Sequence, residues 1–305
     1  MRKRYDVLQR IESLDPVADH LEIYRLTATV EFPWDMNQAL SFALFRTYAV
    51  PTIGELLGRT GEFTERVQKR YDDTGLILDA VLEHGPDSGT GKAAIRRMNQ
   101  MHRSYDISND DMRYVLCTFV VTPIRWMDTY AWRPMSGVEK IASAEYYQAL
   151  GARMGIKDVP GTWQEFARVH DAYEAEHFAF SEGGRAVADS TLALLGTFPP
   201  HDKLPASVVR QTSFALMDDA LLAAFRYPKP NPVLAAATRA GLRARGRALR
   251  FAAPRTEPFY ARQLPTIRSY PDGYDVSALG TFPGGCPVPH AAGAQPASAA
   301  STPSP

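Results

Sequence analysis

The sequence is poor in cysteine and has no excess charge of one sign. Its 305 residues include only Cys117 and Cys286, which lie far apart and have no metal-ligand spacing. A disulfide framework and a zinc site are therefore both unsupported, and a reducing compartment fits best. Basic and acidic residues number 34 each, so no net field favours nucleic acid, and the signatures of DNA- or RNA-binding domains are missing.

Long apolar runs are also missing. Asp6, Arg10 and Glu12 interrupt what would have to be the apolar core of an export signal. The longest apolar stretch, near 115–121, falls short of the ~18 to 20 residues that a membrane-spanning helix needs. We therefore expect a cytoplasmic protein that does not cross a membrane and is long enough to bury a substantial core.

Helix-start signals are frequent along the chain. Four segments have the hydroxyl and carboxylate spacing of a capping box, namely 52–55, 108–111, 136–139 and 162–165. After Ser108 the apolar residues keep a helical period up to Pro123, where we expect a kink or an end. Helical periods recur over 189–198 and 208–225, and Asn231-Pro232 is a good start for another helix.

Strand signals are thin, because only Ile23–Phe32 is rich in β-branched residues. With no internal repeat and no clear linker, the simplest interpretation is one mainly α-helical domain over residues 20–279, preceded by an extension, 1–19. Residues 280–305 are rich in Gly, Pro, Ala and Ser, and we expect this tail to be disordered.

His102 is the first candidate for chemistry. Ile95, Met98, His102 and Tyr105 follow a helical spacing, which places the histidine on an apolar stripe. There it is either a hydrogen-bonded core residue or a ligand of a metal or heme, and the spacing alone favours the core residue. The acids that follow, Asp110 and Asp111, fit the cap and dipole of the next helix.

The segment 62–74 is the second candidate. If it is helical, Arg70 and Thr74 share one face with Asp73 beside them, so that a cation, a hydroxyl and a carboxylate converge. A solvated charged surface explains the same pattern equally well. Glu55 also has two interpretations, as the carboxylate of a capping box or as an acid of the site.

Weaker signals occur further along the chain. Glu174 and His177 form a Glu-x-x-His element of the type found in di-iron bundles, but no second copy is present. We therefore expect His170 and His177 to pack beside Tyr173. The stretch 239–255 is strongly basic with interleaved apolar residues, and is either a charged outer helix or a peripheral contact with an anionic membrane.

Several motifs together resemble the MpaB-like oxygenases, a family related to rubber oxygenase, the latex clearing protein. The resemblance covers roughly residues 20–230, and the ending Leu279–Pro283 is similar to closer bacterial members. It rests on Phe32-Pro33-Trp34-Asp35, Phe45-Arg46-Thr47-Tyr48, Lys69-Arg70-Tyr71-Asp72-Asp73-Thr74, Met98-Asn99-x-Met101-His102, Asn109-Asp110-Asp111-Met112 and Pro123-Ile124-Arg125-Trp126.

The resemblance implies a helical fold enclosing heme b, like a globin in broad character only, with His102 as the axial iron ligand. The stripe that contains Met98 would then form a wall of the heme pocket, and the opposite iron face would be free for O2. Rubber oxygenase has an Arg-x-x-Lys-Thr motif on that side. Arg70 and Thr74 keep its spacing, whereas Asp73 replaces the lysine.

The function implied is O2-dependent cleavage of carbon–carbon double bonds in a hydrophobic, isoprenoid or lipid-like substrate. Arg70 would orient a heme propionate or polarise oxygen, Thr74 would donate a hydrogen bond to O2, and Asp73 or Glu55 would transfer protons. Two alternatives remain open at this point: a non-catalytic heme-binding or gas-sensing protein, and a metal-free helical protein that binds lipid.

Overall fold

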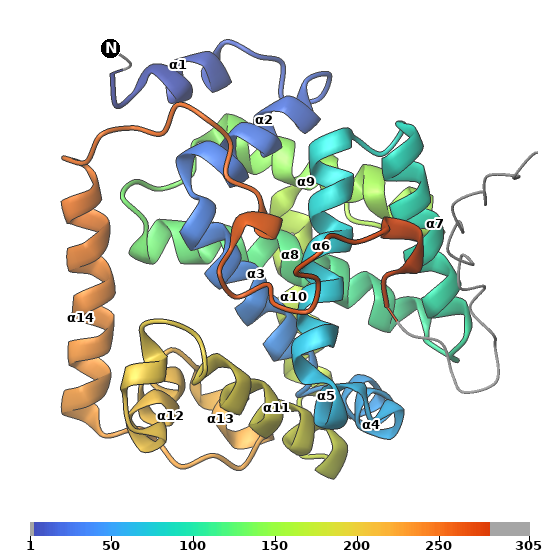
Figure 1. Cartoon of the computed structure of the whole chain (residues 1–305), viewed down its shortest axis with the longest axis vertical. Helices are drawn as coiled ribbons and strands as arrows, with labels where there is room; N and C mark the ends of the chain where they lie inside the picture. The colour runs from blue at the N-terminus through green and yellow to red at the C-terminus, as the bar shows by residue number, and fades with distance from the viewer. Residues whose placement is uncertain (1–2, 281–305) are drawn as a thin grey trace, which may run out of the picture.

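The computed structural model describes residues 3–280, and within that range all regular secondary structure is helical, which confirms the predicted fold class (Figure 1). The α-helices are α1 (Asp6–Glu12), α2 (His20–Leu26), α3 (Pro33–Thr47), α4 (Pro51–Thr60), α5 (Glu62–Glu65), α6 (Val67–His84), α7 (Gly89–Arg103), α8 (Asn109–Tyr130), α9 (Gly137–Met154), α10 (Trp163–His177), α11 (Glu182–Leu195), α12 (Ala206–Phe214), α13 (Asp219–Ala224) and α14 (Pro232–Leu249).

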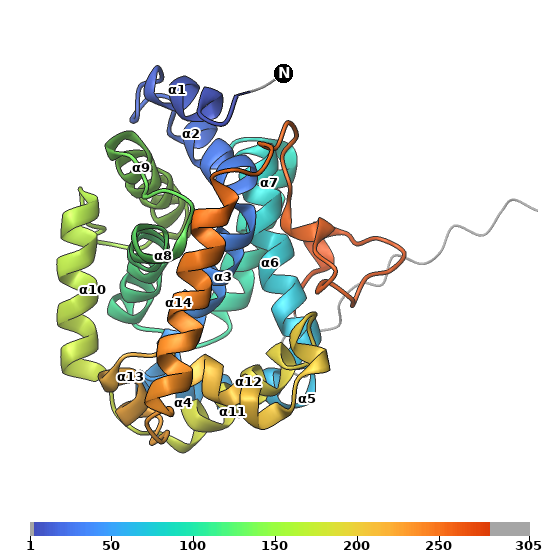
Figure 2. The ribbon, with the colours of Figure 1, turned by 90° about the vertical axis from the view of Figure 1, so that its left-hand side faces the viewer.

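Helix α8 is the centre of the fold. It packs against α3, α9 and α10, and α6 and α7 lie against each other on the far side of α3 (Figures 1 and 2). Pro123 lies inside α8 and does not end it, so of the two expectations the helix end is wrong, and the kink stays a prediction. Burial of Val120 and Ile124 on either side of the proline holds the helix together despite the missing backbone donor.

A second apolar cluster lies at the other end of the molecule. It joins the end of α3 to α11, α12 and α13, with Phe45 and Phe225 in edge-to-face contact at 5.3 Å between ring centroids. The helical periods expected over 189–198 and 208–225 are thus confirmed as α11, α12 and α13, with a break between the last two.

The predicted helix caps are only partly right. Ser108, Ser136 and Thr162 each accept a backbone N–H of the first turn, but only Ser136 closes a full capping box with Glu139. The box predicted over 52–55 is wrong, because Pro51 already occupies the first helical position of α4. Asn231 caps α14 as expected, because its side chain accepts hydrogen bonds from the backbone N–H groups of residues 233 and 234.

The N-terminal region is helical and packed. Val7 and Ile11 of α1 are fully buried in an apolar cluster with Ile23, so part of the predicted extension 1–19 belongs to the body of the fold. The β-branched run 23–32 forms the end of α2 and a π-helix, Thr27–Glu31. Within the described range, no helix is long and apolar enough to span a bilayer. The predicted tail lies outside the described residues apart from Gly280.

Residues 251–280 form an extended segment, here called the C-terminal strap, with short 3₁₀ turns at Ala261–Gln263 and Val276–Ala278. The strap runs from the end of α14 across α6 to α7 (Figure 1). Two buried carboxylates of α6 hold it. Asp79 accepts the backbone N–H of Ala261 at 2.9 Å, and Asp72 accepts that of Ser269 at 2.8 Å. The strap therefore supports the helix that carries Arg70 and Thr74.

Candidate active site

Arg70 and Thr74 lie one turn apart on α6, and their side chains meet as the spacing predicted. Nη1 of Arg70 donates to Oγ1 of Thr74, whose hydroxyl in turn donates to the backbone carbonyl of Arg70 at 2.9 Å. The guanidinium also lies over the ring of Phe63, 5.2 Å from its centroid. These contacts fix a cation and a hydroxyl on one face of the helix.

His102 lies in the last turn of α7, the neighbour of α6. Burial of the imidazole, reinforced by the positive charge of Arg70, lowers the pKa of His102 to about 4. The ring is therefore neutral at pH 7, which is the form that binds metals. Its Nδ1 is buried and has no hydrogen-bond partner among residues 3–280. The hydrogen-bonded core histidine favoured by the spacing alone is thus not seen for this nitrogen.

Met98 lies one turn before His102 and is nearly buried, within the main apolar cluster of the protein. It therefore forms part of an apolar wall next to the histidine, in agreement with the stripe predicted from the spacing. The helical stripe is confirmed for Ile95, Met98 and His102, whereas Tyr105 lies beyond the end of α7 at Arg103.

Asp73 does not join Arg70 and Thr74, so the predicted convergence of three groups is wrong. Its buried carboxylate lies 2.6 Å from Nζ of Lys69 and accepts a hydrogen bond from the hydroxyl of Tyr270 in the C-terminal strap. The charge of Asp73 is thereby compensated on the Lys69 side of α6. Asp73 therefore links α6 to the strap.

Glu55 has a partner that neither prediction foresaw. Its Oε1 accepts the backbone N–H of Gly183, in the first turn of α11, at 3.0 Å. This contact is possible because α4 and α11 approach closely at Gly54 and Gly184, where a Cβ on Gly54 would lie 2.7 Å from the facing Cα. Glu55 thus stabilises the N-terminus of another helix, where a negative charge is favourable.

The Glu-x-x-His element on α10 is not arranged as a metal site. Both carboxylate oxygens of Glu174 accept hydrogen bonds from Arg46. His177 packs beside Tyr173 as expected, with 4.1 Å between ring centroids, whereas His170 packs beside Tyr114. Across the part of the chain that the structure describes, no group of three or more metal-binding side chains is present.

Lys69 and Tyr270 are partners of Asp73 that the sequence-based prediction missed. The i, i+4 spacing of Lys69 and Asp73 is a visible signal for the first pair. The second pair joins Asp73 to Tyr270, which is 197 positions away in a segment without a helical period. No local sequence pattern predicts such a contact.

The helices, the neutral histidine and the Arg70–Thr74 pair define a mainly α-helical protein with one candidate site between α6 and α7. The family model described as "ER-bound oxygenase mpaB/B'/Rubber oxygenase, catalytic domain" matches residues 36–251. The chain belongs to this family, as the sequence resemblance predicted.

Curated relatives support the same assignment. The chain is 31% identical over 275 residues to "ER-bound oxygenase mpaB'" of Penicillium brevicompactum, covering 83% of this chain but only 64% of that protein. It is also 31% identical over 236 residues to "ER-bound oxygenase mpaB" of Penicillium roqueforti, covering 71% of this chain and 78% of that protein. The matched region contains His102, Arg70 and Thr74, whereas the C-terminal strap lies beyond the family model apart from its first residue, Phe251.

Proposed function

We propose that this protein is an oxygenase that binds heme b through His102 and cleaves carbon–carbon double bonds of a hydrophobic, isoprenoid or lipid-like substrate with O2. The observation that carries the proposal is the neutral His102, whose buried Nδ1 has no partner within residues 3–280, next to the Arg70–Thr74 pair. The names of the relatives supply the reaction class.

The residues present fit a heme. An unpaired buried ring nitrogen costs free energy, and a heme environment would relieve that cost, either by coordination or by a hydrogen bond that orients the ring. The low pKa of His102 means that no proton competes with coordination at neutral pH. Met98 and the apolar residues around it suit the flat hydrophobic face of a porphyrin.

When bound, heme supplies an iron at which O2 can be activated. The guanidinium of Arg70 offers donors and a fixed positive charge for a propionate or a polarised oxygen atom. The hydroxyl of Thr74 already donates to the Arg70 carbonyl, so it must exchange that partner to donate to O2. Proton transfer by Asp73 or Glu55 stays a prediction. Asp73 accepts a hydrogen bond from the strap, and Glu55 accepts one from α11.

An absorption spectrum tests the cofactor first. Purified protein, before or after reconstitution with heme, should show a Soret band, and its absence would refute heme binding and favour a metal-free protein. His102→Ala should lose or sharply weaken the band. The matched control is His177→Ala, whose side chain is 40% exposed and which should leave the band unchanged. The opposite result would move the ligand to His177.

Oxygen consumption tests the reaction. Heme-loaded protein should consume O2 with polyisoprenoids or unsaturated lipids and release carbonyl products that mass spectrometry can identify. A heme spectrum without substrate-dependent consumption across the panel would instead favour a heme carrier or gas sensor.

The proposal includes peripheral association with a membrane. The names of the relatives describe those proteins as ER-bound, and a hydrophobic substrate is available at a membrane surface. The basic stretch 239–255 is the contact that the sequence suggests.

A further inference from the structure

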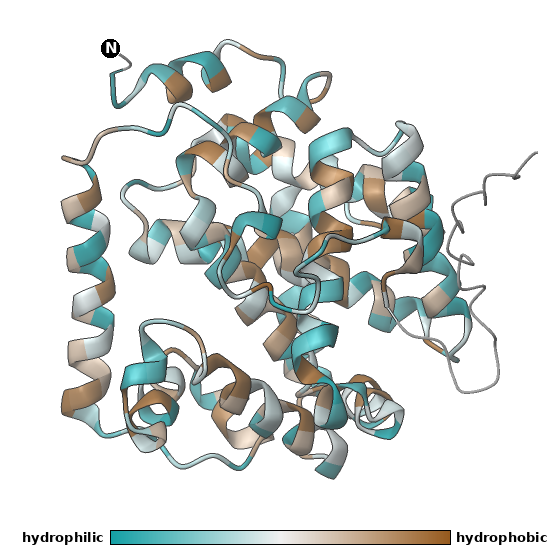
Figure 3. Ribbon diagram, in the orientation of Figure 1, coloured by the Kyte–Doolittle hydropathy of each residue, from teal (hydrophilic) through white to brown (hydrophobic). Residues whose placement is uncertain are grey.

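Helix α14 stands at the edge of the molecule, with one face on the body (Figures 1 and 2). Its inner face is fixed by Gly246, where a Cβ would lie only 2.3 Å from the backbone carbonyl of Tyr130. Leu242 and Leu249 pack on the main apolar cluster from the same side. Apolar and polar residues alternate along the helix (Figure 3).

One exposed stripe of α14 is apolar, which is unusual for a surface helix. Its five residues follow the spacing i, i+4, i+7, i+11 and i+15, and none of the five is charged: Val233, Ala237, Ala240, Ala244 and Ala248. The exposed Arg239, Arg243 and Arg247 of the same helix lie outside this stripe. Phe251 continues the spacing directly after the helix. The side chains of Phe251 and Val233 are the two most exposed large hydrophobic residues in the described chain, at 90% and 76%.

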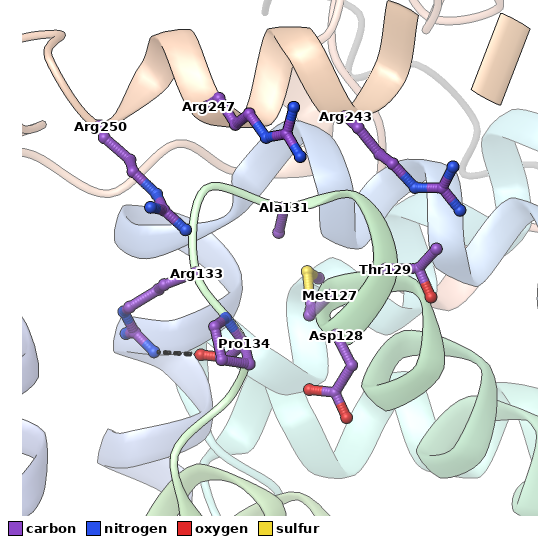
Figure 4. A pocket seen from close by; sticks show the side chains of 9 residues that line it. All are labelled: Met127, Asp128, Thr129, Ala131, Arg133, Pro134, Arg243, Arg247 and Arg250. Atoms are coloured by element: carbon purple, nitrogen blue, oxygen red, sulfur yellow. Dashed lines mark hydrogen bonds between the residues drawn. The ribbon is translucent and has the colours of Figure 1, made fainter. Parts of the chain in front are cut away.

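Three arginines flank this face. Arg243 and Arg247 lie on successive turns of α14, and Arg250 is the residue directly after its end. All three line a hollow of about 280 Å³ between α14 and the end of α8 (Figure 4). Arg250 donates to the carbonyl of Trp132 at 2.7 Å, and Arg243 lies over the ring of Tyr130. All three guanidinium groups remain without a carboxylate partner within residues 3–280.

The other charges of the hollow are compensated within the protein. Arg133 lies 2.6 Å from a carboxylate oxygen of Glu31 and 2.6 Å from one of Glu139. Asp128, the acid of the hollow, lies 2.8 Å from Nζ of Lys140. The arginines of α14 therefore leave the hollow with an uncompensated positive charge.

We propose that this face of α14 docks on an anionic membrane surface, with Arg243, Arg247 and Arg250 binding lipid phosphates and Phe251 inserted among the acyl chains. The inference deepens the membrane association proposed above by naming its surface and its lipid chemistry. It is independent of heme and of oxygenase activity.

The combination of groups favours a lipid over a free anion. Arginine binds phosphate oxygens with several donors at once, and both a soluble phosphate and a lipid headgroup offer such oxygens. Only a membrane also offers an apolar layer for Phe251 and the alanine face beside the arginines. Guanidinium groups beside exposed aromatic residues are typical of the boundary between headgroups and acyl chains.

Cosedimentation of the full chain with vesicles tests this proposal. The protein should bind phosphatidylcholine vesicles that contain phosphatidylserine and should not bind phosphatidylcholine alone. Raising the salt from about 0.1 M to about 1 M should release it, because the Debye length falls from about 10 Å to about 3 Å.

Two variants locate the surface. R243Q/R247Q should lower the partition coefficient about 30-fold, since each arginine near an anionic surface contributes about fivefold. Phe251→Ser should lower it about tenfold. The matched controls are Arg168→Gln on α10, whose side chain is 76% exposed, and Leu204→Ser, at a residue that is 45% exposed. Both should bind like the wild type.

The outcomes separate this inference from the broader proposal. Wild-type protein that binds no vesicles would refute membrane association altogether. Binding that the α14 variants leave unchanged would keep membrane association but refute this surface. A wild-type dimer that Phe251→Ser dissociates, without vesicle binding, would assign the face to a second copy of the chain and overturn the inference.

Discussion

Arg46 joins α3 to α10 through a buried carboxylate, and replacing it by methionine would leave that carboxylate without its main partner. Nε of Arg46 donates to Glu174 at 2.8 Å, and a second bond joins Nη2 to the other carboxylate oxygen. The hydroxyl of Tyr114 adds a third hydrogen bond at 3.0 Å. The side chains of Arg46 and Glu174 are only 10% and 11% exposed, so water compensates little of either charge.

The magnitude follows from the pKa of Glu174. Burial raises it, but the imidazole of His170, whose Nε2 lies 3.1 Å from Oε1 of Glu174, and the hydrogen bonds from Arg46 outweigh burial and lower the pKa from 4.5 to about 2. Such a shift corresponds to about 3 kcal/mol of stability at neutral pH. Because the pKa of the folded state is the lower one, this stability is present above pH 4.5 and is lost as the pH falls from 4.5 towards 2.

Arg46→Met should therefore lower the free energy of unfolding by about 3 to 5 kcal/mol at pH 7, the usual cost of removing one partner from a buried pair. At about pH 3 the difference from wild type should shrink by about 2 kcal/mol, because the wild type has already lost most of the contribution of Glu174. Urea unfolding at both pH values measures the two differences.

A neighbouring pair that joins α8 to α10 provides the control. Arg125 donates two hydrogen bonds to Asp171 at 2.8 and 2.7 Å, and these bonds are the main reason that the pKa of Asp171 is lowered to about 2. Both side chains are more than half exposed, so Arg125→Met should cost less than about 1 kcal/mol. A stability difference between wild type and Arg46→Met that is the same at pH 7 and pH 3 would refute the electrostatic argument.

Three further substitutions test other contacts. Asp72→Ala removes a buried acceptor of the strap, so amide exchange at 268–269 should accelerate and stability should fall by about 2 to 4 kcal/mol; unchanged exchange would contradict this role. Gly246→Ala should lower the free energy of unfolding by about 1 to 3 kcal/mol, measured by thermal unfolding, because the new Cβ would meet a backbone carbonyl of α8. The control is Gly241→Ala, which has open space around it and should be neutral or slightly stabilising. Glu55→Gln should destabilise the start of α11 by about 0.5 to 1 kcal/mol, measured by urea unfolding, and an unchanged midpoint would count against the cap.

The sequence predicted the helices well where the signal is local. Ser108, Ser136, Thr162 and Asn231 all cap helices in the structure, because a side-chain oxygen reaches an N–H only two or three residues ahead. Thr52 is not a cap because α4 already begins at Pro51, with Val50 in the N-cap position. Thr52 instead donates to Asp111 and Glu55 accepts from Gly183, and no local pattern encodes these contacts between helices.

In the candidate site, too, local features could be predicted from the sequence and contacts between helices could not. The Arg70–Thr74 contact follows from helical spacing alone, and the position of His102 on an apolar stripe follows from the period of α7. The pKa of His102 could not be foreseen, because it depends on burial between α6 and α7 and on the charge of Arg70 from the neighbouring helix. Such contacts between elements require the tertiary structure.

Asp73 shows why a motif cannot be transferred as a whole. Rubber oxygenase has lysine at this place in its motif, and here the charge is reversed, but the structure supplies a positive group one turn earlier. Lys69 lies 2.6 Å from the Asp73 carboxylate and donates to the carbonyl of Gly280 at 3.3 Å, and Tyr270 completes the contacts. The reversed charge thus fastens the strap to α6, while Arg70 remains the cation that lowers the pKa of His102. In this chain, position 73 stabilises the site helix, and the proposed chemistry depends on Arg70, Thr74 and His102.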